Sequence, residues 1–339
     1  MKRSPVSLDE IAARDNLVLA TWKAARGKRT RADVQAFLAD LDGSLGRLSA
    51  GILAGAVPKG AFREFLIHDP KQRLIHAACF EDRVLHHAIL NRVEAVFERT
   101  LADSSFACRP GRGNHAAVRR VQQCLRRYPW FGQVDVAAYF PSIRHDVLKA
   151  LLVRRFKGEG FLALLGRIID VYAASPGCGL PIGALTSQHF ANFYLDGADR
   201  RLLANPAVRA CVRYMDDIVW WCDSRAAVRA VRGDLAAWLA AERGLALKPD
   251  VRIQRSGVGI TFCGYRILPG SLRLTRRKQR RYRALRVGWE AAWVGGQIDA
   301  LRLQQGYAAV LAPTLPADAA TWRREDLRRH PCLYDDEGG

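Results

Sequence analysis

Two adjacent aspartates, Asp216 and Asp217, are the residues of this sequence that point most directly to chemistry. They lie between apolar arms in CVRYMDDIVWWCD (211–223), a pattern that predicts a β-hairpin with both carboxylates near its turn. A third aspartate, Asp135, ends the apolar, β-prone run WFGQVD. Carboxylates that share one volume without a neutralising base repel one another, so such a cluster favours a bound cation. Their oxygen atoms suit Mg²⁺, and two such ions can promote an in-line phosphoryl transfer.

An isolated Asp-Asp pair has a simpler explanation, because such pairs commonly fill solvated hairpin turns. The apolar arms around Asp216 and Asp217 argue against it, since a solvated turn does not need an apolar frame. We therefore expect the pair to belong to a site that handles phosphate.

The composition narrows the class of partner. The chain has 339 residues, with 53 Lys and Arg against 33 Asp and Glu, which leaves a net charge of +20. Hydrophobic residues make up 49% of the chain, enough for a folded core of two or three subdomains. A charge this positive indicates a polyanionic partner, nucleic acid before a membrane surface.

The location that we expect is the cytoplasm. No apolar run approaches the length of a membrane span, and the first residues do not resemble a signal peptide. The eight cysteines are scattered without a CxxC pair, which favours reduced thiols over zinc ligands.

The elements that must position the aspartates alternate along the chain, which predicts an α+β fold. Ser7 and Glu10 form a capping-box pattern at the start of a helix that extends to about Ala25. Further helices are expected at about 31–55, 81–98, 145–174, 189–203 and 225–243, and strands within 56–75, 130–140, 211–223 and 259–267. Residues 313–321 are rich in Pro and Ala and are expected to form a loop.

The order of short blocks along the chain resembles that of the reverse transcriptases. The blocks are KQRLI (71–75), EDRVLHHAI (81–89), ACRPGRGNHAA (107–117), QVDVAAYFPSI (133–143), GLPIGALTSQHFANFYLD (179–196), RYMDDIV (213–219), GLALKPD (244–250) and FCGYRI (262–267). The resemblance implies a right-hand polymerase fold with fingers, a palm whose antiparallel sheet carries YMDD, and a small helical thumb. It places an N-terminal helical extension at 1–60, fingers at 61–130, palm at 131–270 with a helical insertion at about 145–178, and thumb at 271–339.

The same resemblance assigns roles to individual residues. Asp135, Asp216 and Asp217 correspond to the carboxylates that hold two Mg²⁺ ions, or Mn²⁺ in their place. The residues that correspond to nucleotide contacts are Lys71, Arg73, Arg112, Phe140, Ile182, Gln188 and Lys248. Phe140 stands at the position of the ring that excludes a ribose 2′-hydroxyl, although core packing alone also explains a phenylalanine there. Lys248 corresponds to a proton donor for pyrophosphate.

A dense basic segment follows Arg273, at the position of the thumb. Its helical content predicts one positive face that contacts the template–primer backbone, through Arg276, Arg277, Lys278, Arg280 and Arg281. Tyr282 is expected to stack on a sugar or base. The alternative is an ordinary solvated helix face.

Within the family, the sequence resembles the reverse transcriptases of diversity-generating retroelements. Pro181-Ile182-Gly183 with Ser187-Gln188 replaces the Gln-Gly and Ser-Pro of most retroviral and intron enzymes. This lineage copies a template RNA into cDNA with errors opposite adenines, and Ile182 lacks the hydrogen-bonding groups of the usual glutamine. The implied partners are template RNA, cDNA or primer, dNTPs and a basic, oligomeric accessory variability protein.

Two alternatives stay open. One is a reverse transcriptase of another bacterial lineage that serves intron mobility or antiphage defence. The other is a basic RNA-binding protein without catalysis, although all three aspartates are present.

Overall fold

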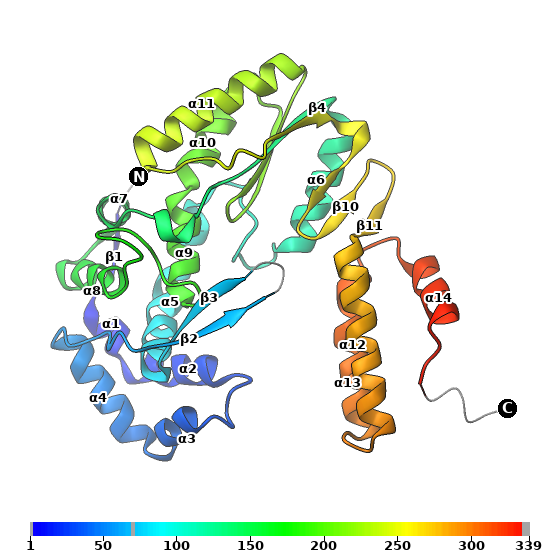
Figure 1. The fold of residues 1–339 in the computed structure, drawn as a ribbon. Helices are drawn as coiled ribbons and strands as arrows, with labels where there is room; N and C mark the ends of the chain where they lie inside the picture. Colours follow the sequence, from blue (N-terminus) through cyan, green and yellow to red (C-terminus); the bar gives the residue numbers. More distant parts are fainter. Residues whose placement is uncertain (1–2, 69–71, 334–339) are drawn as a thin grey trace.

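The structure is a computed structural model that describes residues 3–68 and 72–333, and it has the expected mixture of helices and strands (Figure 1). Within these residues, no helix has the length and hydropathy needed to cross a membrane. All eight cysteines lie in the described part of the chain and carry free thiols.

The N-terminal region is helical, but its helices are shorter than the sequence predicts. The expected first helix is divided into α1 (Leu8–Ala12) and α2 (Arg14–Ala25), and the second into α3 (Ala32–Ala39) and α4 (Leu41–Leu53). Ser7 and Glu10 form the predicted capping box of α1. Ala13 adopts an extended backbone between α1 and α2, and Asp40 accepts a hydrogen bond from the Gly43 amide to cap α4. The breaks let α1, α2 and α4 pack on one another and let α2 pack along α5.

A hairpin and a long helix follow. Strands β2 (Phe62–Ile67) and β3 (Arg73–Ala78) pair antiparallel, as expected for this region, and project beside the sheet (Figure 1). Helix α5 (Phe80–Thr100) packs against α2 and α9 (Leu185–Tyr194) and buries much of its length. Helix α6 (Asn114–Arg127) follows the loop that contains most of the block ACRPGRGNHAA (107–117).

The centre of the molecule is a four-stranded antiparallel sheet. Its strands are β4 (Trp130–Asp135), β6 (Ala210–Tyr214), β7 (Asp217–Cys222) and β8 (Arg252–Arg255), in the order β6-β7-β4-β8. The predicted hairpin at 211–223 is confirmed as β6 and β7.

Both faces of this sheet are buried, in two separate cores. Phe131, Val219 and Trp221 join the core that contains α6, whereas Val134 and Trp220 join the core that contains α11 (Arg225–Arg243). This alternation follows from the two-residue period of a strand. It explains why adjacent tryptophans on β7 are both fully buried.

The middle of the chain connects these layers. It contains a 3-10 turn (Phe140–Ser142), then α7 (His145–Arg155), β5 (Phe156–Lys157), α8 (Glu159–Asp170), α9 (Leu185–Tyr194) and α10 (Asp196–Ala204). Strand β5 pairs in parallel with the N-terminal strand β1 (Ser4–Pro5).

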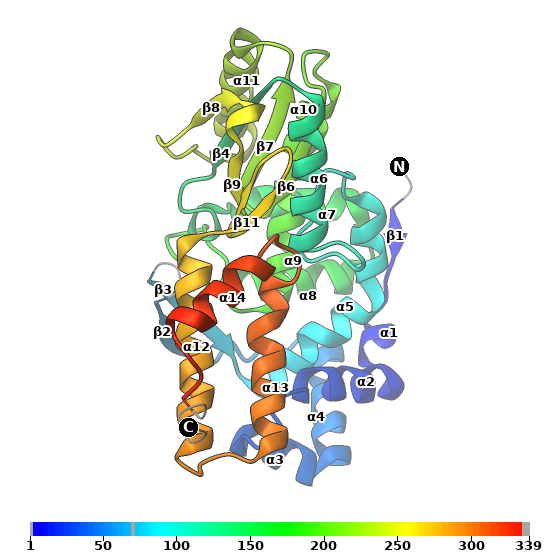
Figure 2. The ribbon, with the colours of Figure 1, turned by 90° about the vertical axis from the view of Figure 1, so that its right-hand side faces the viewer.

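The C-terminal part begins with a small sheet. The single strand expected at 259–267 is a hairpin instead, β9 (Ile260–Phe262) and β10 (Tyr265–Ile267), followed by β11 (Leu272–Leu274). The chain reverses at Cys263 and Gly264, whose φ angles are 48° and 76°. Helices α12 (Arg276–Val294) and α13 (Ala300–Leu311) pack together and extend away from the sheet, with α14 (Ala320–Arg329) beside them (Figures 1 and 2). The loop expected at 313–321 instead contains most of a 3-10 turn (Ala312–Thr314) and the start of α14.

A buried arginine joins these elements beneath the hairpin turn. Arg213 on β6 and Asp199 on α10 form an ion pair of 2.6 Å in which neither side chain is exposed. The guanidinium also donates to the side chains of Asn192 and Ser105 and to the Met215 carbonyl oxygen. The pair therefore ties the sheet, two helices and the turn together.

We expect Arg213→Leu to destabilise the protein by about 3–5 kcal/mol, because it leaves Asp199 buried without its partner. Arg209→Leu is the matched control, since Arg209 pairs with Asp223 at 2.6 Å on the surface of the same hairpin. The control change is expected to cost less than about 1 kcal/mol. Urea unfolding of both variants measures the difference, and equal losses would contradict a structural role for the buried pair.

Candidate active site

The three aspartates lie together at one end of the central sheet. Asp135 is the last residue of β4 and stands opposite Asp217, the first residue of β7, in the antiparallel register. Asp216 lies in the turn, and its carbonyl oxygen accepts a hydrogen bond of 3.2 Å from the Val136 amide. The turn is tight, because Met215 has a φ of 56°. The arrangement confirms the hairpin geometry expected from the sequence.

The electrostatics of the cluster reflect this crowding. Burial raises the pKa of Asp217 to about 7, and the charges of Asp135 and Asp216 act in the same direction. Burial and the Asp135 charge also raise the pKa of Asp216. The protein therefore holds carboxylates that oppose one another's ionisation, which is the condition that a bound cation relieves.

Two polar side chains already contact the cluster. Lys248 Nζ lies 3.5 Å from an oxygen of Asp135, and the Lys248 amide donates to the Asp135 carbonyl oxygen at 2.9 Å. Gln133 Nε2 donates to Asp217 Oδ1 at 2.9 Å and reaches the Thr261 carbonyl oxygen at 3.3 Å. Across residues 3–68 and 72–333, no three His, Cys, Asp or Glu side chains are arranged to enclose a metal ion. The carboxylate oxygens of the three aspartates are suitable ligands for a hard cation. Lys248 and Gln133 already contact two of these carboxylates, those of Asp135 and Asp217.

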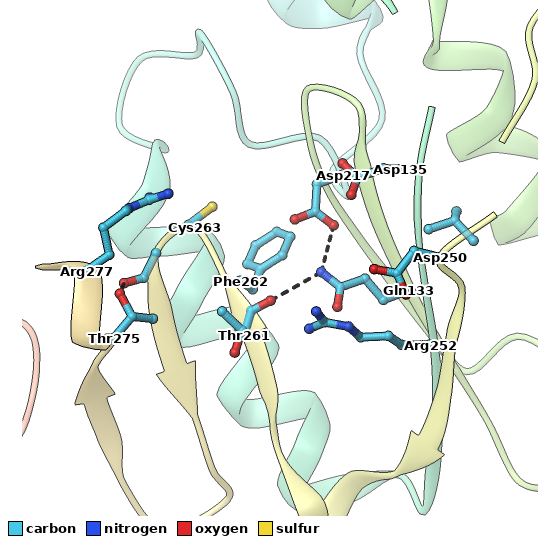
Figure 3. A pocket seen from close by; sticks show the side chains of 12 residues that line it. Gln133, Asp135, Asp217, Asp250, Arg252, Thr261, Phe262, Cys263, Thr275 and Arg277 are labelled. Carbon is cyan, nitrogen blue, oxygen red and sulfur yellow. Dashed lines mark hydrogen bonds between the residues drawn. The ribbon is translucent and has the colours of Figure 1, made fainter. Parts of the chain in front are cut away.

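A cavity of about 390 Å³ opens beside Asp135 and Asp217 (Figure 3). The central sheet forms one wall, and β9, the Cys263–Gly264 turn and the start of α12 form the other. Gln133 lies between the two walls, below Asp217 in Figure 3, with Arg252 beside it and Arg277 across the opening. The cavity is therefore lined by the carboxylates of Asp135, Asp217 and Asp250 and by the guanidinium groups of Arg252 and Arg277.

Gln133, Arg252 and Thr261 were not expected in the site from the sequence. A signal existed for Gln133, because it precedes Asp135 by two residues and strand residues at that spacing share a face. Arg252 and Thr261 carried no such signal, since only pairing of β8 with β4 and packing of β9 bring them there.

The residues that the sequence suggests as nucleotide contacts lie at different distances from the aspartates. Arg73, the first residue of β3, is close enough for its charge to lower the pKa of Asp216 against the larger effect of burial. Lys71 lies outside the described residues. Phe140 begins the 3-10 turn after β4, where its half-buried ring packs on the core and lies 5.7 Å from the Tyr139 ring.

Ile182, Gln188 and Arg112 are held by local contacts. The Ile182 carbonyl oxygen accepts a hydrogen bond of 2.8 Å from the His76 amide, which ties this loop to β3. Gln188 Oε1 accepts a bond of 3.4 Å from the Cys108 thiol. Arg112 forms an ion pair of 2.6 Å with Asp103 and lies over the Phe106 ring, so it is engaged at the edge of its own loop.

The basic segment at α12 divides into outward and inward residues. Arg276, Arg277, Arg280 and Arg281 are exposed, and Arg277 lines the cavity. Lys278 instead turns inward, with Nζ 3.2 Å from the centre of the Tyr265 ring, and burial lowers its pKa to about 8. Tyr282 is buried against the Trp322 ring, so the base-stacking role expected from the sequence does not fit its position.

Comparison with known proteins gives the family. The family model described as "Reverse transcriptase (RNA-dependent DNA polymerase)" matches residues 58–265, the part that contains the β2–β3 hairpin, the central sheet and all three aspartates. The chain is 26% identical to Protein YkfC of Escherichia coli over 262 residues, which are 64% of this chain and 66% of YkfC. It is 25% identical to the group II intron-encoded protein LtrA of Lactococcus lactis over 139 residues, 39% of this chain and 23% of LtrA.

Among solved structures, a telomerase of Candida tropicalis in complex with a telomeric RNA fragment aligns with a TM-score of 0.48 and 12% identity, over 84% of this chain and 58% of the telomerase. The chain spans just under two thirds of YkfC and a smaller share of LtrA. Because the family model covers more than half of its 339 residues, the chain belongs to the reverse transcriptase (RNA-dependent DNA polymerase) family.

Proposed function

We propose that this protein is an RNA-directed DNA polymerase that extends a primer on an RNA template by two-metal nucleotidyl transfer. The observation that carries the proposal is the position of Asp135, Asp216 and Asp217 at one end of the central sheet in a chain of this family. Template RNA, primer and dNTPs are the substrates that follow from such an activity.

The architecture supports a division into fingers, palm and thumb. In Figure 1 the β2–β3 hairpin and the α12–α13 pair lie on opposite sides of the molecule, below the central sheet. In the proposed polymerase the hairpin belongs to the fingers, the central sheet to the palm and α12–α13 to the thumb. The segment from α1 to α4 then forms the helical extension.

Asp135, Asp216 and Asp217 would hold the divalent ions, Mg²⁺ or Mn²⁺. Bound there, the ions supply charge neutralisation and lower the pKa of an attacking hydroxyl. The three carboxylates fit divalent ions in their chemistry, because they offer oxygen ligands. Their burial and crowding raise the pKa of Asp217 to about 7, and a bound cation would relieve this cost of ionisation. In this proposal Lys248, whose Nζ lies 3.5 Å from Asp135, gives a proton to the departing pyrophosphate. Arg73 and Lys71 bind the triphosphate in this proposal, and Arg112 supports the template.

The narrower assignment is to the diversity-generating retroelement lineage, with cDNA mutagenised opposite template adenines. Ile182 and Gln188 support it, because an aliphatic side chain at position 182 cannot donate a hydrogen bond to the nascent pair. A basic accessory variability protein belongs to the same proposal. A role in intron mobility is the second candidate, favoured by the similarity to LtrA. A template repeat and a matching variable repeat beside the gene would distinguish the two.

We expect the double variant Asp216→Asn/Asp217→Asn to lose primer extension by at least about 10³-fold, because neutral amides bind divalent ions weakly. Extension of a labelled DNA primer on an RNA template measures the loss. A folded double variant that still extends the primer would contradict the metal assignment.

The stability of the same variant provides the control for folding. The folded-state pKa of Asp217 is raised from 3.8 to about 7, so this group favours the folded state most below pH 4 and its contribution is lost as the pH rises to about 7. Without divalent ions, the double variant is therefore expected to be more stable than the wild type at pH 8. Thermal unfolding with chelator measures this gain, and added Mg²⁺ should stabilise only the wild type.

Phe140→Ala is expected to raise the incorporation of ribonucleotides by at least about tenfold, because a smaller side chain leaves room for a 2′-hydroxyl. Primer extension with single dNTPs and rNTPs gives the ratio of kcat/KM values. Tyr139→Phe is the control, since it removes a buried hydroxyl beside the same turn without opening space. An unchanged ratio in Phe140→Ala would indicate that this ring only packs on the core.

Ile182→Gln is expected to lower misincorporation opposite template adenine by a few-fold, because the amide restores a hydrogen-bonding group near the nascent pair. Sequencing of cDNA made on one defined RNA measures errors at each template base. Wild-type errors spread evenly over all four bases would contradict the adenine-specific proposal. Ile182→Leu, which keeps an aliphatic side chain, should retain the wild-type error spectrum.

A further inference from the structure

Helix α6 carries a basic face, and the sequence around the helix contains no acidic residue. The sequence from residue 104 to residue 134 contains no Asp or Glu, and it surrounds the whole of α6 (Asn114–Arg127). Two arginines of this stretch are engaged elsewhere, Arg109 with Glu98 and Arg112 with Asp103. The four arginines on α6 itself are exposed and form no ion pair with any residue that the structure describes; they are Arg119, Arg120, Arg126 and Arg127.

Helix geometry places these four side chains on one face. At about 100° per residue, positions 119, 120, 126 and 127 fall within an arc of about 120°, and the two pairs lie about 10 Å apart along the axis. The opposite face holds Ala117, Val121 and Cys124, which are buried against the sheet. Figure 2 shows α6 in front of the sheet, with its outer side toward the viewer. A face of this kind concentrates positive charge where solvent and ligands reach it.

The basic face continues into a hollow at the C-terminal end of α6. The hollow has a volume of about 520 Å³ and is lined by Arg126, Arg127 and Tyr128 from the end of the helix and by Arg255 from β8, with prolines and Ser256 around them. Arg127 lies 5.5 Å from the ring centre of Tyr128, which lines the same hollow. A half-buried aromatic ring paired with a guanidinium group provides both stacking and phosphate contacts.

This surface is separate from the candidate active site. Trp130 begins β4 and Asp135 ends it, so the hollow and the carboxylates are about 17 Å apart along the strand. None of the four α6 arginines lines the cavity beside Asp217. A nucleic-acid segment that contacts α6 is therefore distinct from the nucleotides at the carboxylates.

We propose that the outer face of α6, with the hollow at its C-terminal end, binds an unpaired segment of RNA outside the polymerase active site. The charge of the face fits a phosphate backbone, and the Arg127–Tyr128 pair fits bases that are free to stack, which RNA loops and single strands offer. An acidic protein surface would interact with the charge but would not stack on the aromatic ring. Binding at this face does not require catalysis, so the inference stands apart from the proposed polymerase activity.

The test uses the full chain with the active site already filled. The protein is saturated with an unlabelled RNA–DNA primer–template, and a fluorescent single-stranded RNA is then titrated and followed by anisotropy. We expect the variant R119Q/R120Q/R126Q/R127Q to bind this second RNA at least about tenfold more weakly near 0.1 M salt. The slope of log K against log salt should fall by roughly 3, as expected for four lost contacts to a single strand.

A matched control removes the same charge from another face. Arg201 lies on α10, and Arg225, Arg229 and Arg232 lie on α11, all four exposed. The variant R201Q/R225Q/R229Q/R232Q is expected to bind the second RNA with the wild-type affinity. Both variants should extend a short primer–template at the wild-type rate. A protein that binds the second RNA but extends no primer would contradict the proposed activity and leave this inference standing.

Four results would overturn the inference. They are an unchanged affinity in the α6 variant, an equal loss in the control variant, tighter binding of duplex DNA than of single-stranded RNA, and displacement of the RNA by an acidic peptide at equal charge. The charge-preserving variant R127K tests stacking separately from charge and is not expected to disturb folding. It is expected to keep the salt slope while losing the preference for single-stranded over duplex RNA, because lysine does not stack on the Tyr128 ring.

Discussion

The buried ion pair between Arg213 and Asp199 is the contact on which the geometry of the candidate site depends. A guanidinium without solvent access must satisfy its donors within the protein, and Arg213 does so through Asp199, Asn192, Ser105 and the Met215 carbonyl oxygen. The last of these bonds reaches the turn that carries Asp216. Met215 has a left-handed backbone conformation and lies next to carboxylates that repel one another. The buried Arg213 stabilises this turn through its bond to the Met215 carbonyl oxygen.

The central sheet supports this anchor because both of its faces are packed. Gly132 stands opposite Trp220 in the register, and a Cβ at position 132 would lie 2.3 Å from the Trp220 ring. The close approach of ring and backbone leaves the strands little freedom to shift. Strands held so firmly can keep Asp135 and Asp217 opposite each other although their charges repel. Stability provided by the cores thus offsets the local destabilisation of the site.

The distribution of arginine shows why net charge alone is a poor guide to nucleic-acid contacts. Several arginines are internal, including Arg109 with Glu98, Arg213 with Asp199 and Arg286 with Glu290. Others form surface ion pairs. Exposed basic side chains gather along the start of α12 and on the outer face of α6, and Arg252 and Arg277 line the cavity beside the aspartates. The excess charge is therefore arranged in separate surfaces.

The sequence by itself determined the features that arise from local patterns: the capping box at Ser7, the β-hairpin with aspartates at its turn and the α+β order of elements. It also carried the blocks that indicate the family. The tertiary structure alone decided the helix breaks at Ala13 and Asp40, the reversal at Cys263, the inward turn of Lys278 and the burial of Tyr282. It likewise decided that Gln133 holds Asp217 and that Arg213 holds the turn. Periodicity and capping act over a few residues and are visible in the sequence, whereas the partner of a side chain depends on which distant segments the fold brings against it.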